Sequence, residues 1–221
     1  MKLLIEALTK FACGLLMVAL LIFLPAGTLC YTYGWLFVGL LFVPMLIAGL
    51  VMLKKSPEFL KKRLDAKEKQ GTQKGVVAFS GLMFIVGFVV AGLDFRFGWS
   101  HMPAWVTIIA SVLFLVAYAL YAEVMRENAY LSRTIKVEEG QTVVDTGLYG
   151  IVRHPMYTAT IAMFLAMPLV MGSWWAFLVM IPYVLAIVTR IKDEETLLTK
   201  ELEGYQEYKE KVRWRLIPYI W

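Results

Sequence analysis

The sequence predicts an all-α, polytopic integral membrane protein, a helical bundle of about six apolar segments that ends in a C-terminal helical hairpin. Hydrophobic residues make up 60% of the 221 residues, and the mean hydropathy is +0.67. A soluble domain is only about 45–50% apolar. Several apolar runs also approach or exceed the roughly 18 residues that a helix needs to cross a bilayer. These two observations place the chain in the membrane.

The N-terminal region, 1–125, holds four of the apolar segments. We expect spans at about 11–26, 36–53, 76–93 and 104–121. The basic start before the first run is also typical of a signal peptide, but the run is long and no small-residue cleavage pattern is clear. Residues 54–75 form a polar, basic loop, with a helical turn predicted after Ser56-Pro57.

The C-terminal region, 126–221, combines polar and apolar segments. A polar connector at 130–145 precedes the predicted hairpin 156–190, whose two arms are separated by Gly172-Ser173. Each arm holds a proline, which favours kinked backbone. We therefore leave open whether the hairpin crosses the bilayer squarely. A charged helix follows, and the last residues mix cations with aromatic rings, as in an interfacial tail.

The charges and cysteines exclude other classes. The net charge of +5 does not indicate nucleic-acid binding, because the basic residues flank apolar spans. With six crossings, 21 of the 22 Lys and Arg residues fall on one side, and all but Arg96 are then cytoplasmic. This bias predicts that both termini, the basic loop and the active site are cytoplasmic. Cys13 and Cys30 form no disulfide or metal pattern and are expected to be small buried residues.

The segment GLYGIVRHPMY, residues 147–157, is the most unusual part of the chain. It holds one of only two histidines, next to Arg153 and just before a proline that can begin a helix. A helix N-terminus carries free N–H groups that suit an anion. The alternative is that Arg153 anchors the membrane edge and His154 caps the helix.

A helical hairpin returns its ends to one level, so the residues before it can meet those after it. One pocket is predicted to hold Tyr149, Arg153, His154, Tyr157, Arg190 and Glu194. Cations, carboxylates and rings together suit a zwitterionic, aromatic ligand such as an adenosyl compound. Arg190 and Glu194 are four residues apart and share a helix face, whereas Glu195 lies about 100° round. The alternative is an ordinary Arg–Glu pair on a solvated helix.

Four pieces of the C-terminal half resemble the isoprenylcysteine carboxyl methyltransferase family, within the wider group that includes phospholipid N-methyltransferases. They are ENAYLS at 127–132, GQTVVDTGLYGIVRHPMY at 140–157, RIKDEETLL at 190–198 and GYQEYKEKVRWRLIP at 204–218. The resemblance implies a membrane methyltransferase that uses S-adenosylmethionine and methylates a lipidic acceptor that approaches from the bilayer, in the first place a prenylcysteine-type carboxylate. We also expect no metal, because methyl transfer to an ionised carboxylate needs alignment rather than a general base.

Carried over residue by residue, the resemblance implies a set of site residues. The cofactor-binding residues would be Gln141, Thr142, Val143, Val144, Tyr149, Arg153, His154, Pro155, Met156, Tyr157, Glu194 and Glu195. Which of the two glutamates faces the cofactor stays open. Arg190 and Glu194 are the candidate catalytic residues, and Arg190 would contact or orient the acceptor. Gln141, Leu148 and Lys136 depart from residues common in the family, so the acceptor stays open.

Two further functions remain as alternatives. A phospholipid N-methyltransferase would use the same cofactor, and an enzyme similar to sterol reductases would use NADPH and need added cations for its 2′-phosphate. A non-enzymatic transporter is disfavoured, because the spans hold almost no mid-membrane charge. The membrane would be the plasma (inner) membrane in a prokaryote and the endoplasmic reticulum in a eukaryote.

Overall fold

The protein is a bundle of helices with no strand among the residues that the structure describes. The computed structural model describes residues 2–64, 71–131, 137 and 139–221, with the side chains of 71–73 left out. The elements are α1 (Lys2–Ala26), α2 (Thr32–Lys55), α3 (Pro57–Leu64), α4 (Gly71–Phe97), α5 (Ala104–Glu127), the 3₁₀ turn η1 (Gly147–Gly150), α6 (Pro155–Val170), α7 (Trp174–Met180), α8 (Tyr183–Glu201) and α9 (Tyr205–Lys211). The all-α prediction is confirmed.

Five stretches of the described chain are long and apolar enough to cross a membrane. They are α1, α2, α4 from Lys74, α5, and α7 with α8. The sixth apolar segment, α6, has 16 residues and so is about 24 Å long, less than the roughly 30 Å of a bilayer core. The first arm of the hairpin is therefore short, and Pro182 divides its second arm into α7 and α8.

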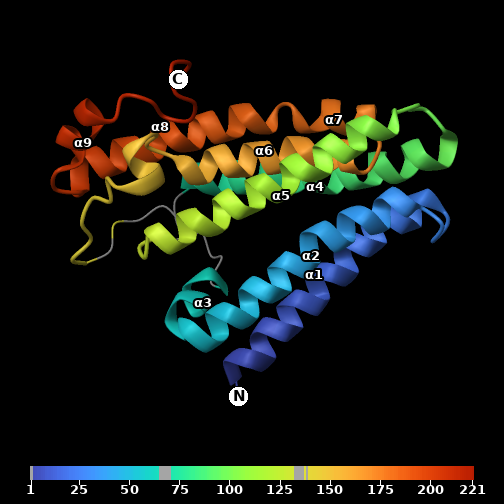
Figure 1. Cartoon of the computed structure of the whole chain (residues 1–221), viewed down its shortest axis with the longest axis horizontal. Helices are drawn as coiled ribbons and strands as arrows, with labels where there is room; N and C mark the ends of the chain where they lie inside the picture. The colour runs from blue at the N-terminus through green and yellow to red at the C-terminus, as the bar shows by residue number, and fades with distance from the viewer. Residues whose placement is uncertain (1, 65–70, 132–136, 138) are drawn as a thin grey trace.

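Helices α4 to α8 lie together, and α1 and α2 lie along one side of them (Figure 1). The buried core includes residues of α1 and α2 as well, such as Ile22 and Phe37. Helices α5 and α6 pack closely because small residues face one another, and Ala110, Ala117, Ala159 and Ala166 are all almost fully buried. Helix α1 approaches α4 at Gly92, where a Cβ atom would lie 2.4 Å from the Ile22 carbonyl oxygen. In Figure 1, α1 and α2 diverge from α5 toward the end where α3 lies.

A buried polar cluster joins the loops at the opposite end of the bundle. The Asp94 carboxylate accepts hydrogen bonds from the backbone N–H of Ser100 at 2.6 Å, from the Ser100 hydroxyl at 2.6 Å, and from the Ser173 hydroxyl. Ser173 also caps α7 by accepting the Ala176 N–H at 3.0 Å. This cluster ties the start of α7, at the turn of the hairpin, to Asp94 on α4.

Two expectations differ from the fold. The first span was expected at about 11–26, but α1 is continuous from Lys2, with a Glu6–Lys10 pair at 2.7 Å one turn apart. Cys13 and Cys30 are exposed, not buried, because α1 lies at the edge of the bundle and Cys30 in the loop that follows it. The helical turn predicted after Ser56-Pro57 is present as α3.

Candidate functional site

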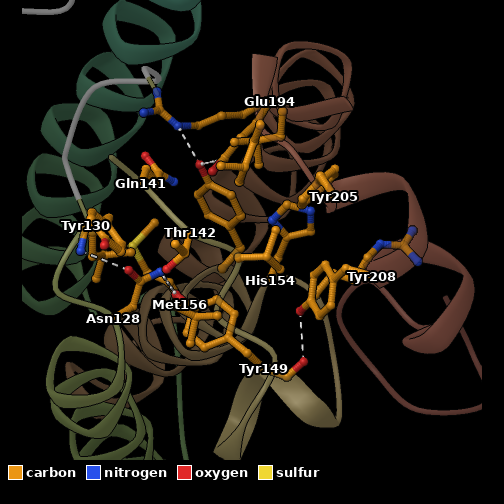
Figure 2. A pocket seen from close by; sticks show the side chains of 18 residues that line it. Asn128, Tyr130, Gln141, Thr142, Tyr149, His154, Met156, Glu194, Tyr205 and Tyr208 are labelled. Atoms are coloured by element: carbon orange, nitrogen blue, oxygen red, sulfur yellow. Dashed lines mark hydrogen bonds between the residues drawn. The ribbon is translucent and has the colours of Figure 1, made fainter. Parts of the chain in front are cut away.

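A pocket lies at the end of the bundle where α5 ends, α6 begins and α8 passes into charged sequence (Figure 2). The connector 141–144, η1 and α9 complete its walls. The described residues that line it are Asn128, Tyr130, Leu131, Gln141, Thr142, Val143, Val144, Tyr149, Arg153, His154, Met156, Tyr157, Arg190, Glu194, Leu198, Leu202, Tyr205 and Tyr208. The two ends of the hairpin therefore meet in space.

Three side chains form a hydrogen-bonded chain in the wall of this pocket. The Tyr157 hydroxyl donates to the Glu194 carboxylate at 2.6 Å and accepts from Nε of Arg190 at 2.9 Å. Tyr157 and Arg190 are both buried. The Glu194 carboxylate and the Arg190 guanidinium are thus both hydrogen-bonded to the Tyr157 hydroxyl. The pocket wall therefore places an anion close to a cation. This arrangement suits a ligand that carries both charges.

The neighbouring Glu195 belongs to a separate, buried ion-pair cluster. Its Oε1 accepts from Nε of Arg153 at 2.7 Å and lies 3.3 Å from Nε2 of His154, and its Oε2 accepts from Nε of Arg215 at 2.8 Å. The side chain of Arg153 is only 5% exposed and that of Glu195 6%. Because the cluster is buried, the removal of one charged side chain would leave its partner's charge uncompensated, which costs stability. Glu195 thus joins α8 to the residues before α6.

The C-terminal tail also holds the residues before α6 in place. The Trp214 and Arg215 carbonyls accept the N–H groups of Arg153 and His154, both at 2.9 Å. The Val212 and Arg213 carbonyls accept Nη1 of Arg153 at 2.7 and 2.9 Å. The predicted interfacial tail is therefore part of the site's framework.

The opposite wall is built on Tyr149. Its hydroxyl accepts a hydrogen bond from the Asn128 amide at 3.0 Å, and its carbonyl accepts the Tyr208 hydroxyl at 2.8 Å (Figure 2). Burial raises the pKa of the Tyr149 phenol well above its usual range, and the nearby Glu194 and Glu127 carboxylates raise it further, against the hydrogen bond from Asn128. The phenol therefore stays neutral at physiological pH.

A glycine permits the turn that carries Tyr149. Gly147 has a φ of +55°, and a Cβ there would lie 1.8 Å from Oε1 of Glu127. The Glu127 carboxylate instead accepts the Leu148 N–H at 2.9 Å. Helix α5 and η1 are joined at this point because glycine leaves room for the carboxylate.

Tyr205 carries a buried polar atom that the described part of the chain leaves unsatisfied. Its hydroxyl oxygen is inaccessible and has no hydrogen-bond partner among the described residues, yet the residue lines the pocket. Burial is the main cause that raises the pKa of Tyr205 and of its neighbour Tyr208 above their usual values. Because an unpaired buried hydroxyl costs free energy, its position is a candidate for a ligand contact.

The structure brings most of the predicted site residues to one pocket. Those that line it are Gln141, Thr142, Val143, Val144, Tyr149, Arg153, His154, Met156, Tyr157, Arg190 and Glu194. Two are not brought there: Pro155 begins α6, and Glu195 lies in the ion-pair cluster, where Arg153 also directs its guanidinium. Of the two glutamates, only Glu194 lines the pocket. The departure at Lys136 lies outside the described residues.

Sequence reasoning gave no role to the tyrosines of α9. Tyr205 and Tyr208 lie three residues apart on one helix face, within the GYQEY segment that carries the family resemblance, and this spacing is the signal that could have identified them. Tyr130, Leu131, Leu198 and Leu202 complete the additional lining residues. Asn128, which the sequence alone left without a role, supports Tyr149.

Comparisons with known proteins bear on this site. A family model described as phospholipid methyltransferase matches residues 105–204, which include every lining residue except Tyr205 and Tyr208. A Delta(14)-sterol reductase of Methylotuvimicrobium alcaliphilum is 26% identical over 135 residues, 54% of this chain and 32% of that protein. The Delta(14)-sterol reductase TM7SF2 of Mus musculus is 33% identical over 91 residues, 40% of this chain and 22% of that protein.

The chain thus spans a third or less of the length of these curated relatives. The family match covers the helices that build the pocket except α9, and the apolar helices mark an integral membrane protein. Over residues 105–204 this chain is similar to phospholipid methyltransferases, and that similarity supports a membrane methyltransferase.

Proposed function

We propose that this protein is an S-adenosylmethionine-dependent methyltransferase that methylates a lipidic acceptor, in the first place a carboxylate of the prenylcysteine type. The observation that carries the proposal is the pocket that holds Glu194 and Arg190 on the Tyr157 phenol, inside a wall of tyrosines. This pocket coincides with the region similar to phospholipid methyltransferases, a family whose members generally use S-adenosylmethionine.

The chemistry of the lining residues fits this cofactor. Glu194 can accept from an ammonium or a ribose hydroxyl, and Asn128, Gln141 and Thr142 supply amide and hydroxyl groups for the edge of a purine. The tyrosine faces suit a sulfonium or an adenine ring. The unsatisfied Tyr205 hydroxyl supports a polar contact with a ligand. The free volume is about 100 Å³, so side chains must move to admit a ligand of this size.

Within this proposal the residues act by alignment rather than by acid–base catalysis. Bound S-adenosylmethionine supplies a methyl group on a sulfonium, and its transfer to a carboxylate oxygen forms an ester and leaves a neutral thioether. Arg190 attracts the acceptor carboxylate and orients it, and Glu194 holds the cofactor on the other side of Tyr157. A carboxylate is ionised at neutral pH, so no general base is needed. Alignment and exclusion of water supply the rate enhancement.

A phospholipid amine is the second acceptor, favoured by the description of the matching family. An amine is mostly protonated at neutral pH and would have to lose a proton before it attacked the methyl group. The Arg190 guanidinium repels an ammonium and attracts a carboxylate. The charge at the acceptor side of the pocket therefore favours the carboxylate.

An NADPH-dependent reductase is the third candidate, because the two curated relatives are described as Delta(14)-sterol reductases. A 2′-phosphate calls for a cluster of cations. In the described part of the pocket wall the Lys and Arg residues are Arg153 and Arg190. Arg153 is bound by Glu195 and two carbonyls, and Arg190 by Tyr157. This charge pattern supports the adenosyl cofactor over NADPH.

The proposed membrane orientation places both termini and the pocket in the cytoplasm, because the basic residues gather at that end. Cys30 lies in the loop between α1 and α2, at the opposite end, and is exposed. In sealed cells, a Cys13→Ala variant should react at Cys30 with an impermeant maleimide. Protection of Cys30 in intact cells, with labelling only after lysis, would contradict this orientation.

The experiment that tests the proposed function is a methyl-transfer assay with isotopically labelled S-adenosylmethionine. The purified chain in lipid nanodiscs is offered a prenylcysteine carboxylate, its methyl ester and an ethanolamine phospholipid. Label transfer to the carboxylate alone supports the first acceptor, and transfer to the phospholipid supports the second. Absence of transfer to all three, together with NADPH oxidation in the presence of an unsaturated sterol, would refute the proposal.

A further inference from the structure

An apolar groove of about 570 Å³ lies between α2, α3 and α5. This volume lies within the roughly 300–1,000 Å³ of small-molecule sites. Three of the lining residues are small, Ala48 on α2 and Ala119 and Ala122 on α5, and they leave space between the helices. The groove occurs where α1 and α2 diverge from the rest of the bundle (Figure 1). Pro44, Ile47, Val51, Met52, Phe59, Leu115 and Met125 supply its apolar lining.

The groove changes from apolar to cationic along its length. Helices α2 and α5 both run toward the pocket end, so Pro44 and Leu115 lie at the far end of the groove and Lys55 and Arg126 at the near end. Arg126 is ion-paired with Glu123, so Lys55 supplies the positive charge of the groove lining at this end. Lys55 follows Pro44 by eleven residues, or about 16 Å along the helix. A lipid with an anionic head matches this gradient, with its chain between α2 and α5 and its head toward the pocket.

Arg63 lies beside the cationic end of the groove. It follows the groove residue Phe59 by one helical turn on α3. Its Nη2 donates to the Tyr121 hydroxyl, and its guanidinium lies over the Tyr121 ring at 5.5 Å. The residue is only 9% exposed, and its Nη1 has no hydrogen-bond partner among the described residues. A buried cation with an unsatisfied donor is costly, which points to an anion that completes it.

Tyr121 connects this arginine to the pocket. On α5 it lies three residues after Tyr118, which lines the groove, and seven before Asn128, which lines the pocket. Seven residues are about two helical turns, so Tyr121 and Asn128 lie on the same face of α5. The Arg63–Tyr121 pair therefore lies about 10 Å along α5 from the wall of the pocket.

We propose that the groove holds the hydrocarbon chain of the methyl acceptor and that Arg63 binds its carboxylate. The inference rests on the proposed methyltransferase function and deepens it by assigning the acceptor's hydrocarbon chain to a groove that α2 and α3, outside the family match, form with α5. Arg63 then favours anionic lipids as they bind in the groove, before the carboxylate reaches Arg190 in the pocket. The residues of the cofactor pocket take no part in binding the hydrocarbon chain of the acceptor.

The test measures acceptor binding without the cofactor. N-acetyl-S-farnesylcysteine and its methyl ester, which lacks the charge, are titrated calorimetrically into the full chain in nanodiscs. The wild type is expected to bind the acid at least tenfold more tightly than the ester. Arg63→Gln should remove this preference, Arg63→Lys should retain part of it, and the exposed control Lys61→Ala should retain it in full. Equal wild-type affinities for acid and ester, or an acid preference that survives in Arg63→Gln, would overturn the inference.

A second pair of variants tests the groove. Ala119→Trp fills it and should weaken binding of acid and ester alike by tenfold or more. Leu113→Trp, on another face of α5 and also exposed, should leave both affinities unchanged. Unchanged binding in Ala119→Trp would refute the groove assignment.

S-adenosylmethionine affinity, measured on the same preparations, separates this inference from the proposed function. Arg63→Gln should keep cofactor affinity within about twofold. If the wild type binds no S-adenosylmethionine but prefers the acid through Arg63, only the proposed function fails. If it binds S-adenosylmethionine and Arg63→Gln keeps the acid preference, only the inference fails.

Discussion

Glu194 and Glu195 are adjacent glutamates with different partners, so replacing each by glutamine separates cofactor binding from stability. Glu195→Gln removes the charge at the centre of the buried cluster with Arg153, His154 and Arg215. Glu194→Gln leaves that cluster intact and changes the group that accepts the Tyr157 hydroxyl. Because the two substitutions are chemically identical, each serves as the control for the other.

The magnitude for Glu195→Gln follows from the burial of its partners. Removing one member of a buried ion pair costs about 3–5 kcal/mol, because the other charge is left uncompensated. Arg153 keeps the Val212 and Arg213 carbonyls, glutamine retains one acceptor, and the Arg215 side chain is 33% exposed, which weakens its share through screening. We therefore expect the lower end, about 3 kcal/mol, which is more than a hundredfold in the folded-to-unfolded ratio.

For Glu194→Gln the expected pattern is the reverse. The free energy of unfolding should change by no more than about 1 kcal/mol, since a neutral acceptor remains for Tyr157. The affinity for S-adenosylmethionine should fall roughly 10- to 150-fold, as expected for the loss of a charge-assisted contact worth about 1.5–3 kcal/mol.

The assay combines thermal unfolding of both variants in nanodiscs with calorimetric titration of S-adenosylmethionine below the unfolding transition. Wild-type unfolding of Glu195→Gln together with unchanged cofactor affinity of Glu194→Gln would refute the assignment of the two roles. A loss of cofactor affinity in Glu195→Gln that matches the loss in Glu194→Gln, without loss of stability, would refute it as well.

Three further predictions follow from single contacts. Tyr205→Phe removes the unsatisfied hydroxyl, so the ligand-free protein should unfold at the wild-type temperature or slightly above it. The affinity for S-adenosylmethionine should fall roughly 2- to 10-fold, and an unchanged affinity in the titration would exclude the contact. Gly147→Ala forces a side chain into the left-handed region and against Glu127, and it should cost about 1–3 kcal/mol of unfolding free energy; wild-type denaturation would contradict this. Arg190→Ala should keep cofactor affinity within a few-fold and lower single-turnover methyl transfer at least tenfold, and intact turnover would return Arg190 to a structural role.

The apolar segments could be predicted because hydropathy is a property of the local sequence. The proximity of the two ends of the hairpin could be predicted because antiparallel helices joined by a short turn return to the same level. The predicted pocket residues are all found in the lining: Tyr149, Arg153, His154, Tyr157, Arg190 and Glu194. The choice between Glu194 and Glu195 could not be made from helix geometry alone. It depended on Arg215 and the carbonyls of the tail, which approach from more than ten residues away in the chain.

Other parts of the site depend on long-range packing that no local pattern encodes. The tail was interpreted as interfacial because cations and aromatic rings alternate there, yet its carbonyls bind Arg153 and His154. Tyr205 and Tyr208 reach the pocket only because Leu202 ends α8 and Gly204, with a φ of +80°, turns the chain into α9. Arg63 looked like one more cation in a basic loop, and its burial against Tyr121 depends on the packing of α3 on α5.

The measurement that tests the central claim most directly is calorimetric titration of the purified chain with S-adenosylmethionine, with its demethylated product S-adenosylhomocysteine, and with NADPH. The pocket, with Glu194 beside the Tyr157 phenol and its two described arginines held by protein partners, predicts binding of both adenosyl ligands and little or none of NADPH. Glu194→Gln should weaken both adenosyl ligands in the same preparation. Binding of NADPH without binding of either adenosyl ligand would contradict the account and favour a reductase.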